Sequence, residues 1–173
     1  MSVAIAQRDL DAIRAQAERD YPHETCGLLG GTQTGGVKRV TRIVPLANAR
    51  QDSPENRYLI EPDVFRRAAA ALERGGLDVL GVYHSHPDHP ARPSAFDREH
   101  AWPRLSYVIV RVERGRAGDT NSWVLSDDRA SFDEEPIIIE EGRHHGSHGT
   151  DSHPPAPLRG RQAGGRDRRD ERG

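Results

Sequence analysis

The sequence predicts an α/β fold, a mixed β-sheet flanked by helices, followed by a disordered C-terminal tail. Strand-like apolar stretches and two amphipathic helical stretches are intermixed along residues 1–140, as expected for one layered domain. The tail, residues 141–173, has Leu158 as its only large apolar residue. Such a segment cannot bury enough apolar surface to offset the entropy of ordering, so we expect it to be disordered.

The predicted domain begins with a helix and a hairpin. Residues 2–6 are expected to form a short edge strand. Apolar residues at three- and four-residue intervals then form one helical stripe: Leu10, Ile13, Ala17 and Tyr21. Pro22 ends this helix. The apolar stretch 26–30 and the loose alternation over 37–46 predict two strands, with a turn at Gly35-Gly36.

A polar loop, a second helix and three strands are predicted downstream. Residues 47–56 are rich in turn formers, and residues 58–60 are expected to be a brief strand. Pro62 starts a helix that Gly75-Gly76 ends. Its apolar stripe consists of Val64, Phe65, Ala68, Ala69 and Leu72. The later strands are expected over residues 105–112, 121–126 and 136–140.

The stretch 82–102, VYHSHPDHPARPSAFDREHAW, holds more histidine, proline and charged residues than a core needs. The apolar run 77–83 before it is typical of a strand buried on both faces. His84 and His86 therefore lie at its carboxyl end. Because side chains two apart on an extended chain share a face, both imidazoles can reach one point while Ser85 looks away. This pattern predicts a chelating pair.

A carboxylate follows at helical spacing. Ser94 starts a segment, SAFDREHAW, that is long enough for two helical turns, which places Ser94 and Asp97 on one face. Two histidines and a carboxylate leave a tetrahedral zinc one open position for water, as in catalytic sites. Two simpler interpretations stay open: His-x-His as a polar loop, and Ser94-x-x-Asp97 as a helix-capping arrangement. The combination favours a metal site.

The string His84-x-His86-Pro87, six residues, Ser94, two residues and Asp97 resembles the signature of the JAMM/MPN+ zinc metallopeptidases. It matches without a gap or a substitution. The resemblance covers residues 1 to about 140 and implies the mixed sheet and flanking helices of the MPN fold. Four chemically committed residue types at fixed spacing rarely coincide by chance, so the motif is specific.

The resemblance also implies residue roles. His84, His86 and Asp97 would hold one Zn²⁺ per chain. Glu24, in YPHETCGLLGG, is similar to the upstream glutamate of the family, which implies that it acts as the general base. Ser94 would donate a hydrogen bond to the tetrahedral oxyanion. These are the expected catalytic and metal-binding residues.

Small bacterial members of this family typically act on the C-terminal tails of ubiquitin-like proteins, including sulfur carriers that end in Gly-Gly. The resemblance therefore implies a zinc peptidase that processes such a tail or releases an attached amino acid. One alternative is an isopeptidase that deconjugates a ubiquitin-like modifier, and another is a non-catalytic MPN scaffold module. Asn48 is similar to an asparagine that follows a proline in family members, which places it along the substrate groove.

Other residues offer rival chemistry. Cys26 is the only cysteine and could be a nucleophile, but Gly-Leu-Leu follows it and predicts burial, which keeps a thiol protonated and inert. The tail histidines could bind stray metal, although flexible ligands make weak sites: His144, His145, His148 and His153. A zinc deaminase would need a Cys-x-x-Cys pair, which one cysteine cannot supply.

Composition narrows the remaining classes. The 173 residues include 25 basic and 27 acidic ones, so no long-range attraction to nucleic acid is indicated. A single cysteine excludes an internal disulfide, and no apolar run approaches the length of a membrane span. The first thirty residues lack a signal-peptide pattern. We expect a cytoplasmic protein, and the sequence indicates no particular oligomeric state.

Overall fold

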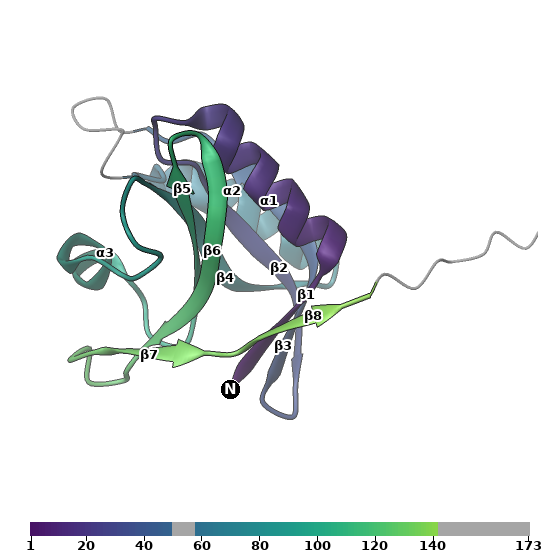
Figure 1. Cartoon of the computed structure of the whole chain (residues 1–173). Coiled ribbons are helices and arrows are strands. Elements are labelled where there is room, and N and C mark those ends of the chain that lie inside the picture. The colour runs from purple at the N-terminus through teal and green to yellow at the C-terminus, as the bar shows by residue number, and fades with distance from the viewer. Residues whose placement is uncertain (50–57, 142–173) are drawn as a thin grey trace, which may run out of the picture. The chain divides into compact units, whose positions relative to one another are not determined.

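The structure is a computed structural model that describes residues 1–49 and 58–141. These residues form a mixed sheet of eight strands in the order β7-β6-β5-β4-β2-β3-β1-β8, with three helices (Figure 1). The elements along the chain are β1 (Ser2–Ala6), α1 (Gln7–Asp20), β2 (Cys26–Thr34), β3 (Val37–Leu46), α2 (Pro62–Arg74), β4 (Asp78–Pro87), α3 (Ala95–His100), β5 (Ser106–Glu113), β6 (Arg116–Leu125), β7 (Phe132–Glu135) and β8 (Ile137–Glu140). The predicted α/β fold with a mixed sheet is confirmed.

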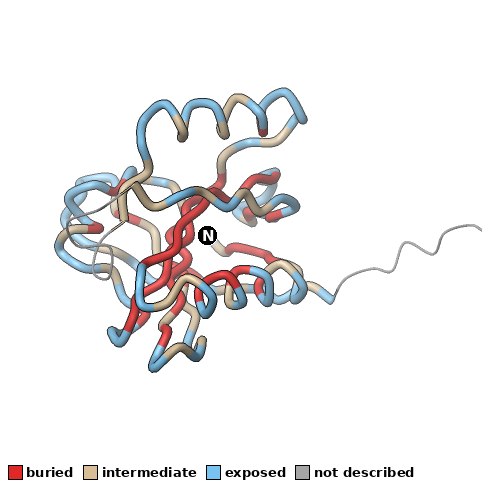
Figure 2. The backbone as a smooth tube through the Cα atoms, turned by 90° about the horizontal axis from the view of Figure 1, so that it is seen from above, coloured by how far each residue is buried: buried red, intermediate tan, exposed pale blue. Residues whose placement is uncertain are grey.

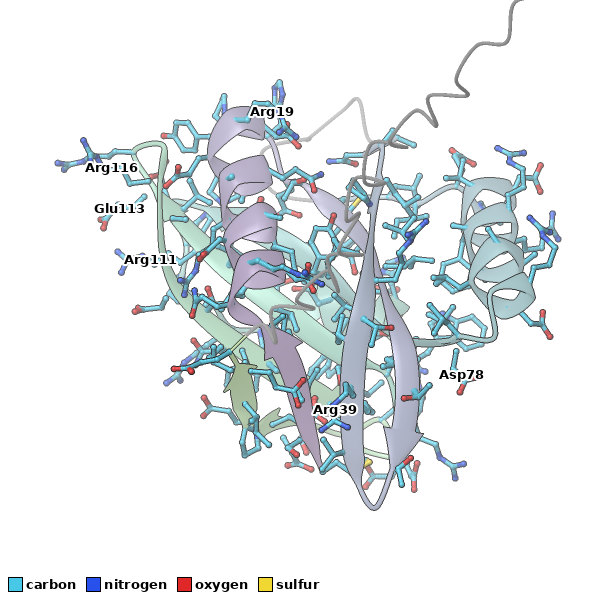
Figure 3. The ribbon with its side chains drawn as sticks, turned by 90° about the vertical axis from the view of Figure 1, so that its right-hand side faces the viewer. Arg19, Arg39, Asp78, Arg111, Glu113 and Arg116 are labelled. Carbon is cyan, nitrogen blue, oxygen red and sulfur yellow. The ribbon has the colours of Figure 1, made fainter. Side chains whose placement is uncertain are left out.

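The helices α1 and α2 lie on opposite faces of the sheet (Figures 1 and 3). Helix α1 buries Leu10, Ile13 and Ala17 of the predicted stripe in one core cluster, whereas Tyr21 follows the helix and is half-buried. Helix α2 buries only Leu72, and the rest of its predicted stripe is half-buried (Figure 2). Among the described residues, no helix is long and apolar enough to span a bilayer.

Two strand predictions were wrong, and one strand was missed. β1 is not an edge strand, because β3 and β8 pair with it in parallel on its two sides. Residues 58–60 form no strand, and the Leu59 N–H donates to the side chain of Asn48 instead of to a neighbouring strand. β7 was not predicted, because its sequence, FDEE, lacks an alternating apolar pattern. The predicted tail lies outside the described residues, except for Glu141.

The two edges of the sheet are joined by a single residue. Only Pro136 separates β7 from β8, although these strands end the strand order on opposite sides. The sheet must therefore curve until its edges come near each other, and Figure 1 shows β7 running on into β8. A curved sheet encloses an interior in which side chains of distant strands meet.

A buried ion pair lies in this interior. Nζ of Lys38, on β3, is 3.6 Å from a carboxylate oxygen of Glu135, on β7, and both side chains are almost fully enclosed. Nζ also donates to Oγ of Ser106 at 2.9 Å, and that hydroxyl donates to Glu135 at 2.6 Å. Burial lowers the pKa of Lys38, while Glu135 opposes this shift. The pair thus connects strands from the two halves of the sheet.

Replacing Lys38 by methionine should destabilise the fold. The variant leaves the carboxylate of Glu135 buried without its cation, and breaking such a pair costs about 3–5 kcal/mol. Urea unfolding measures the loss. Lys38→Met/Glu135→Leu should recover most of it, because no uncompensated charge remains.

The matched control is Arg39→Met, at the next position on β3 (Figure 3). Arg39 pairs with Glu140 at the surface, where its side chain is 57% exposed. Losing an exposed pair costs about 1 kcal/mol or less. Equal losses for Lys38→Met and Arg39→Met would show that the buried pair does not support the fold.

Candidate metal centre

The two histidines lie on the central strand β4, between antiparallel β2 and parallel β5. The strand was expected to end at Tyr83, but its pairing with β5 continues to Pro87, opposite Val112. His84 and His86 are both buried and point to the same face, with their Nε2 atoms 3.1 Å apart. The predicted chelating pair is therefore present, within the strand and not after it.

Ser85 lies between the histidines and faces the other way, as predicted. Its Oγ accepts a hydrogen bond from the Thr25 N–H at 2.9 Å, and its own N–H donates to the Thr25 carbonyl at 3.1 Å. These bonds fix the chain next to Glu24 against β4. Gly27 is required nearby, because a Cβ there would lie 2.4 Å from the ring of Tyr83. The junction between α1 and β2 therefore holds Glu24 beside the histidine strand.

Asp97 comes from the first turn of α3. One carboxylate oxygen, Oδ2, accepts hydrogen bonds from the N–H and the hydroxyl of Ser94, both at 2.6 Å. The Asp97 N–H donates to Ser94 Oγ at 3.1 Å, which completes a capping box. Oδ1 lies 3.3 Å from His84 Nε2, and Oδ2 lies 3.5 Å from His86 Nε2. The helix cap and the ligand set therefore use the same carboxylate.

This donor set fits a metal ion. His84, His86 and Asp97 each offer one ligand atom, and these atoms all lie within 4.8 Å of one another. Ligands bonded to a tetrahedral zinc at about 2.0–2.1 Å are about 3.3 Å apart, close to the distances seen here. Nδ1 of His86 donates to the Pro90 carbonyl at 2.8 Å, which leaves Nε2 for the metal. Two imidazole nitrogens and a carboxylate oxygen this close could share one cation.

The protonation states of His84 and Asp97 also suit metal binding. Burial lowers the pKa of His84 to about 4, so this imidazole is neutral at pH 7. Burial works against ionisation of Asp97, yet His84, His86 and Ser94 hold its pKa well below the ordinary range. Burial alone would lower the pKa of His86, but its bonds to Asp97 and Pro90 raise it. A neutral imidazole and an ionised carboxylate are the forms that bind metal.

Glu24 lies at the edge of this cluster and opens to the surface. It lines a hollow of about 530 Å³ together with His86 and Ser94, and a second hollow of about 570 Å³ together with Asn48. Its side chain is nevertheless largely buried, and burial raises the pKa of its carboxyl to about 8. The charge of Asp97 adds to the shift, while His86 opposes it. A carboxyl tuned near neutral pH can take up and return a proton.

The structure places two further residues at the site. Tyr58 stacks on the ring of His84 with centroids 4.6 Å apart, although its stretch was predicted to be a strand. Asn48 donates from Nδ2 to the Glu24 carbonyl at 3.1 Å, so it lies beside the site and holds the backbone of Glu24. Cys26 is buried as predicted, and burial raises the pKa of its thiol to about 12. A thiol held protonated in this way is a poor nucleophile.

The fold and the site together define a class: a mixed sheet with one His-His-Asp centre and an adjacent carboxyl. The family of prokaryotic homologs of the JAB domain matches residues 6–126. The chain belongs to this family, which confirms the resemblance to JAMM/MPN+ proteins.

Several relatives have names that describe cleavage. A probable TtuB-protein conjugate cleaving protease of Thermus thermophilus is 41% identical over 62% of this chain and 69% of its own. A desampylase of Haloferax volcanii is 38% identical over 63% and 78%. A CysO-cysteine peptidase of Mycobacterium tuberculosis is 31% identical over 80% and 92%.

Solved structures agree with the fold. The solution structure of protein DSY2949 from Desulfitobacterium hafniense has a TM-score of 0.71 and 35% identity, over 84% of this chain and 99% of that one. A protein from Salinibacter ruber has a TM-score of 0.63 and 42% identity, over 83% and 94%.

The shifted pKa of Glu24 predicts a pH-dependent stability of the metal-free protein. Its folded pKa of about 8 is above its ordinary value of 4.5. As pH rises through this window, the unfolded chain releases its proton first, so the folded state loses stability. Glu24→Gln has no such proton. In chelator-treated protein, the variant should unfold at higher urea than wild type at pH 8, with little difference near pH 5.

Glu113→Gln, at the exposed end of β5, is the control and should give no such pH-dependent gain (Figure 3). A gain for Glu24→Gln that is equal at pH 5 and pH 8 would contradict the raised pKa.

Proposed function

We propose that this chain is a zinc peptidase that hydrolyses an amide bond at the C-terminal tail of a ubiquitin-like or sulfur-carrier protein. The observation that carries the proposal is the buried His-His-Asp donor set beside a carboxyl that opens to a hollow. The relatives' names support the substrate class, since they describe cleavage of a TtuB-protein conjugate and of CysO-cysteine.

His84, His86 and Asp97 would hold one Zn²⁺. Bound there, zinc would lower the pKa of a water molecule and polarise the substrate carbonyl. Glu24 would take the proton of the attacking water and return it to the leaving nitrogen, for which a pKa near neutrality is suited. Asn48 and Thr25 would keep the backbone of Glu24 in place through the bonds described above.

Ser94 would donate to the oxyanion that develops on the carbonyl oxygen. In the structure its hydroxyl donates to Asp97. The N–H of Ser94 donates to the same oxygen, so Asp97 would keep one bond from Ser94 when the hydroxyl turns toward the substrate. Ser94 would therefore position the ligand first and contact the reacting oxygen second.

The relatives' names also support a second candidate within the same chemistry. The desampylase and the conjugate-cleaving protease favour an isopeptidase that removes a ubiquitin-like modifier from another protein. The same residues would carry out both reactions, so the site chemistry does not separate them. A non-catalytic scaffold module is disfavoured, because all three metal ligands and Glu24 are present.

Glu24→Gln tests the mechanism. The variant removes proton transfer while keeping the shape of the side chain and the three protein ligands. It should retain its zinc but cleave a carrier protein with one residue beyond its Gly-Gly terminus about 10²- to 10⁴-fold more slowly. Ser94→Ala should lose about 10²- to 10³-fold. Single-turnover cleavage, followed by intact mass, measures both rates, with metal content determined on the same samples.

Cys26→Ser is the control and should keep most of the activity, because the buried thiol has no role in this mechanism. A chelator should abolish cleavage, and zinc should restore it. Cleavage by Glu24→Gln at the wild-type rate would refute the mechanism, and so would loss of activity on thiol alkylation alone.

A further inference from the structure

The hollow beside Glu24 shares lining residues with two further hollows, and together the three would form a longer groove. On the side of α3 it adjoins a hollow of about 390 Å³, and the two share Arg92, Ser94 and Ala95 in their linings. On the other side Glu24 itself also lines the hollow next to Asn48. A groove with Glu24 in its middle can hold an extended peptide on both sides of a scissile bond.

The two arms of this groove differ in charge. The α3 arm is lined by Arg92 and Arg98, and none of the described residues that line its outer hollow is acidic. In the opposite arm Arg19 is neutralised, because its Nε lies 3.3 Å from a carboxylate oxygen of Asp20. Of the described arginines that line the two arms, only those of the α3 arm therefore present uncompensated positive charge to a substrate.

Arg92 is the arginine that lines the central hollow of this groove. It lines the same hollow as Glu24 and His86, its side chain is exposed, and its guanidinium makes no ion pair or hydrogen bond with the described residues. Its N–H donates to the Pro90 carbonyl at 2.8 Å, the same oxygen that accepts from His86. The backbone of Arg92 is thus fixed relative to His86, one of the proposed metal ligands. Its guanidinium remains available to bind a substrate.

We propose that Arg92 binds the free α-carboxylate of the residue released from the carrier tail, and so selects a short linear C-terminal extension over an isopeptide bond. This inference rests on the proposed function. The carrier tail would occupy the arm next to Asn48, and the leaving residue the arm next to α3. A guanidinium pairs with a carboxylate through two parallel hydrogen bonds, which fixes direction as well as position.

The bond changes of hydrolysis explain why this contact distinguishes substrates. Water adds to the carbonyl, the C–N bond breaks, the tail ends in a new carboxylate, and the leaving nitrogen gains a proton. A single residue beyond the tail already carries an α-carboxylate before cleavage. A lysine side chain in an isopeptide bond carries no carboxylate at that distance, so Arg92 would have no partner there.

The test compares two forms of one substrate. TtuB and CysO, the carriers named for two of the relatives, are each extended by one C-terminal alanine, prepared as the free carboxylate and as the carboxamide. For the zinc-loaded full chain, kcat/KM should be about 10- to 100-fold higher for the carboxylate form, mainly through KM. The Arg92→Gln variant should cleave the carboxylate and carboxamide forms with the same kcat/KM. That value should be close to the one that wild type shows for the carboxamide. Arg92→Lys should keep part of the preference.

Arg116→Gln is the matched control. Arg116 lies at the turn between β5 and β6 and points away from the sheet, so the substitution should leave the preference unchanged (Figure 3). A second readout is the affinity of the slowly cleaving, zinc-loaded Glu24→Gln for the two forms, measured by calorimetry. Glu24→Gln should bind the carboxylate form more tightly than the carboxamide form. The double variant Glu24→Gln/Arg92→Gln should bind the two forms equally.

The outcomes separate the inference from the proposed function. Cleavage of both forms at equal rates by wild type, or a preference that persists in Arg92→Gln, would overturn the role of Arg92 and leave the peptidase activity intact. Cleavage of an isopeptide-linked conjugate faster than of the carboxylate form would also overturn it. No cleavage of any form by the zinc-loaded wild type would overturn the proposed function itself.

Discussion

The extended backbone of β4 from Tyr83 to Pro87 is the constraint on which the site depends. β5 pairs with this whole segment on one side, while on the other side β2 pairs with it up to His84 and Thr25 bonds to Ser85. The backbone is therefore extended through both histidines, and His84 and His86 face the same side. The two imidazoles then need no further structure to converge. Asp97 has only to be brought to them, and its capping bonds with Ser94 orient it. The ligand set thus combines a strand period with one helical turn.

The molecule buries two polar clusters that behave differently. Lys38 and Glu135 neutralise each other in the interior of the curved sheet, and Ser106 bonds to both of them. Glu24 is also buried, but it faces a hollow, and burial raises the pKa of its carboxyl to about 8. A polar cluster that is internally neutralised stabilises a fold. Glu135 also lines a hollow, but Lys38 neutralises it, whereas Glu24 forms no ion pair with the described residues. A buried carboxyl without such a cation is available for proton transfer.

Local patterns were enough to predict much of this arrangement. The two-residue strand period puts His84 and His86 on one face, and the Ser94-x-x-Asp97 spacing gives the capping contact, because both depend only on nearby backbone geometry. The contacts of Tyr58 with His84 and of Ser85 with Thr25 were not predictable, since they join segments distant in the sequence. The prediction that β1 is an edge strand was wrong for the same reason, because β1 pairs with β3 and β8, which are distant in the sequence. The role of Glu24 came from the resemblance, not from its own surroundings in the sequence.

Anomalous diffraction at the zinc edge, from crystals of the zinc-loaded chain, tests the central claim most directly. The account predicts one strong peak within about 2.0–2.2 Å of Nε2 of His84, Nε2 of His86 and a carboxylate oxygen of Asp97. A peak at Cys26 or on the histidines of residues 142–173, with none among these three ligands, would contradict it.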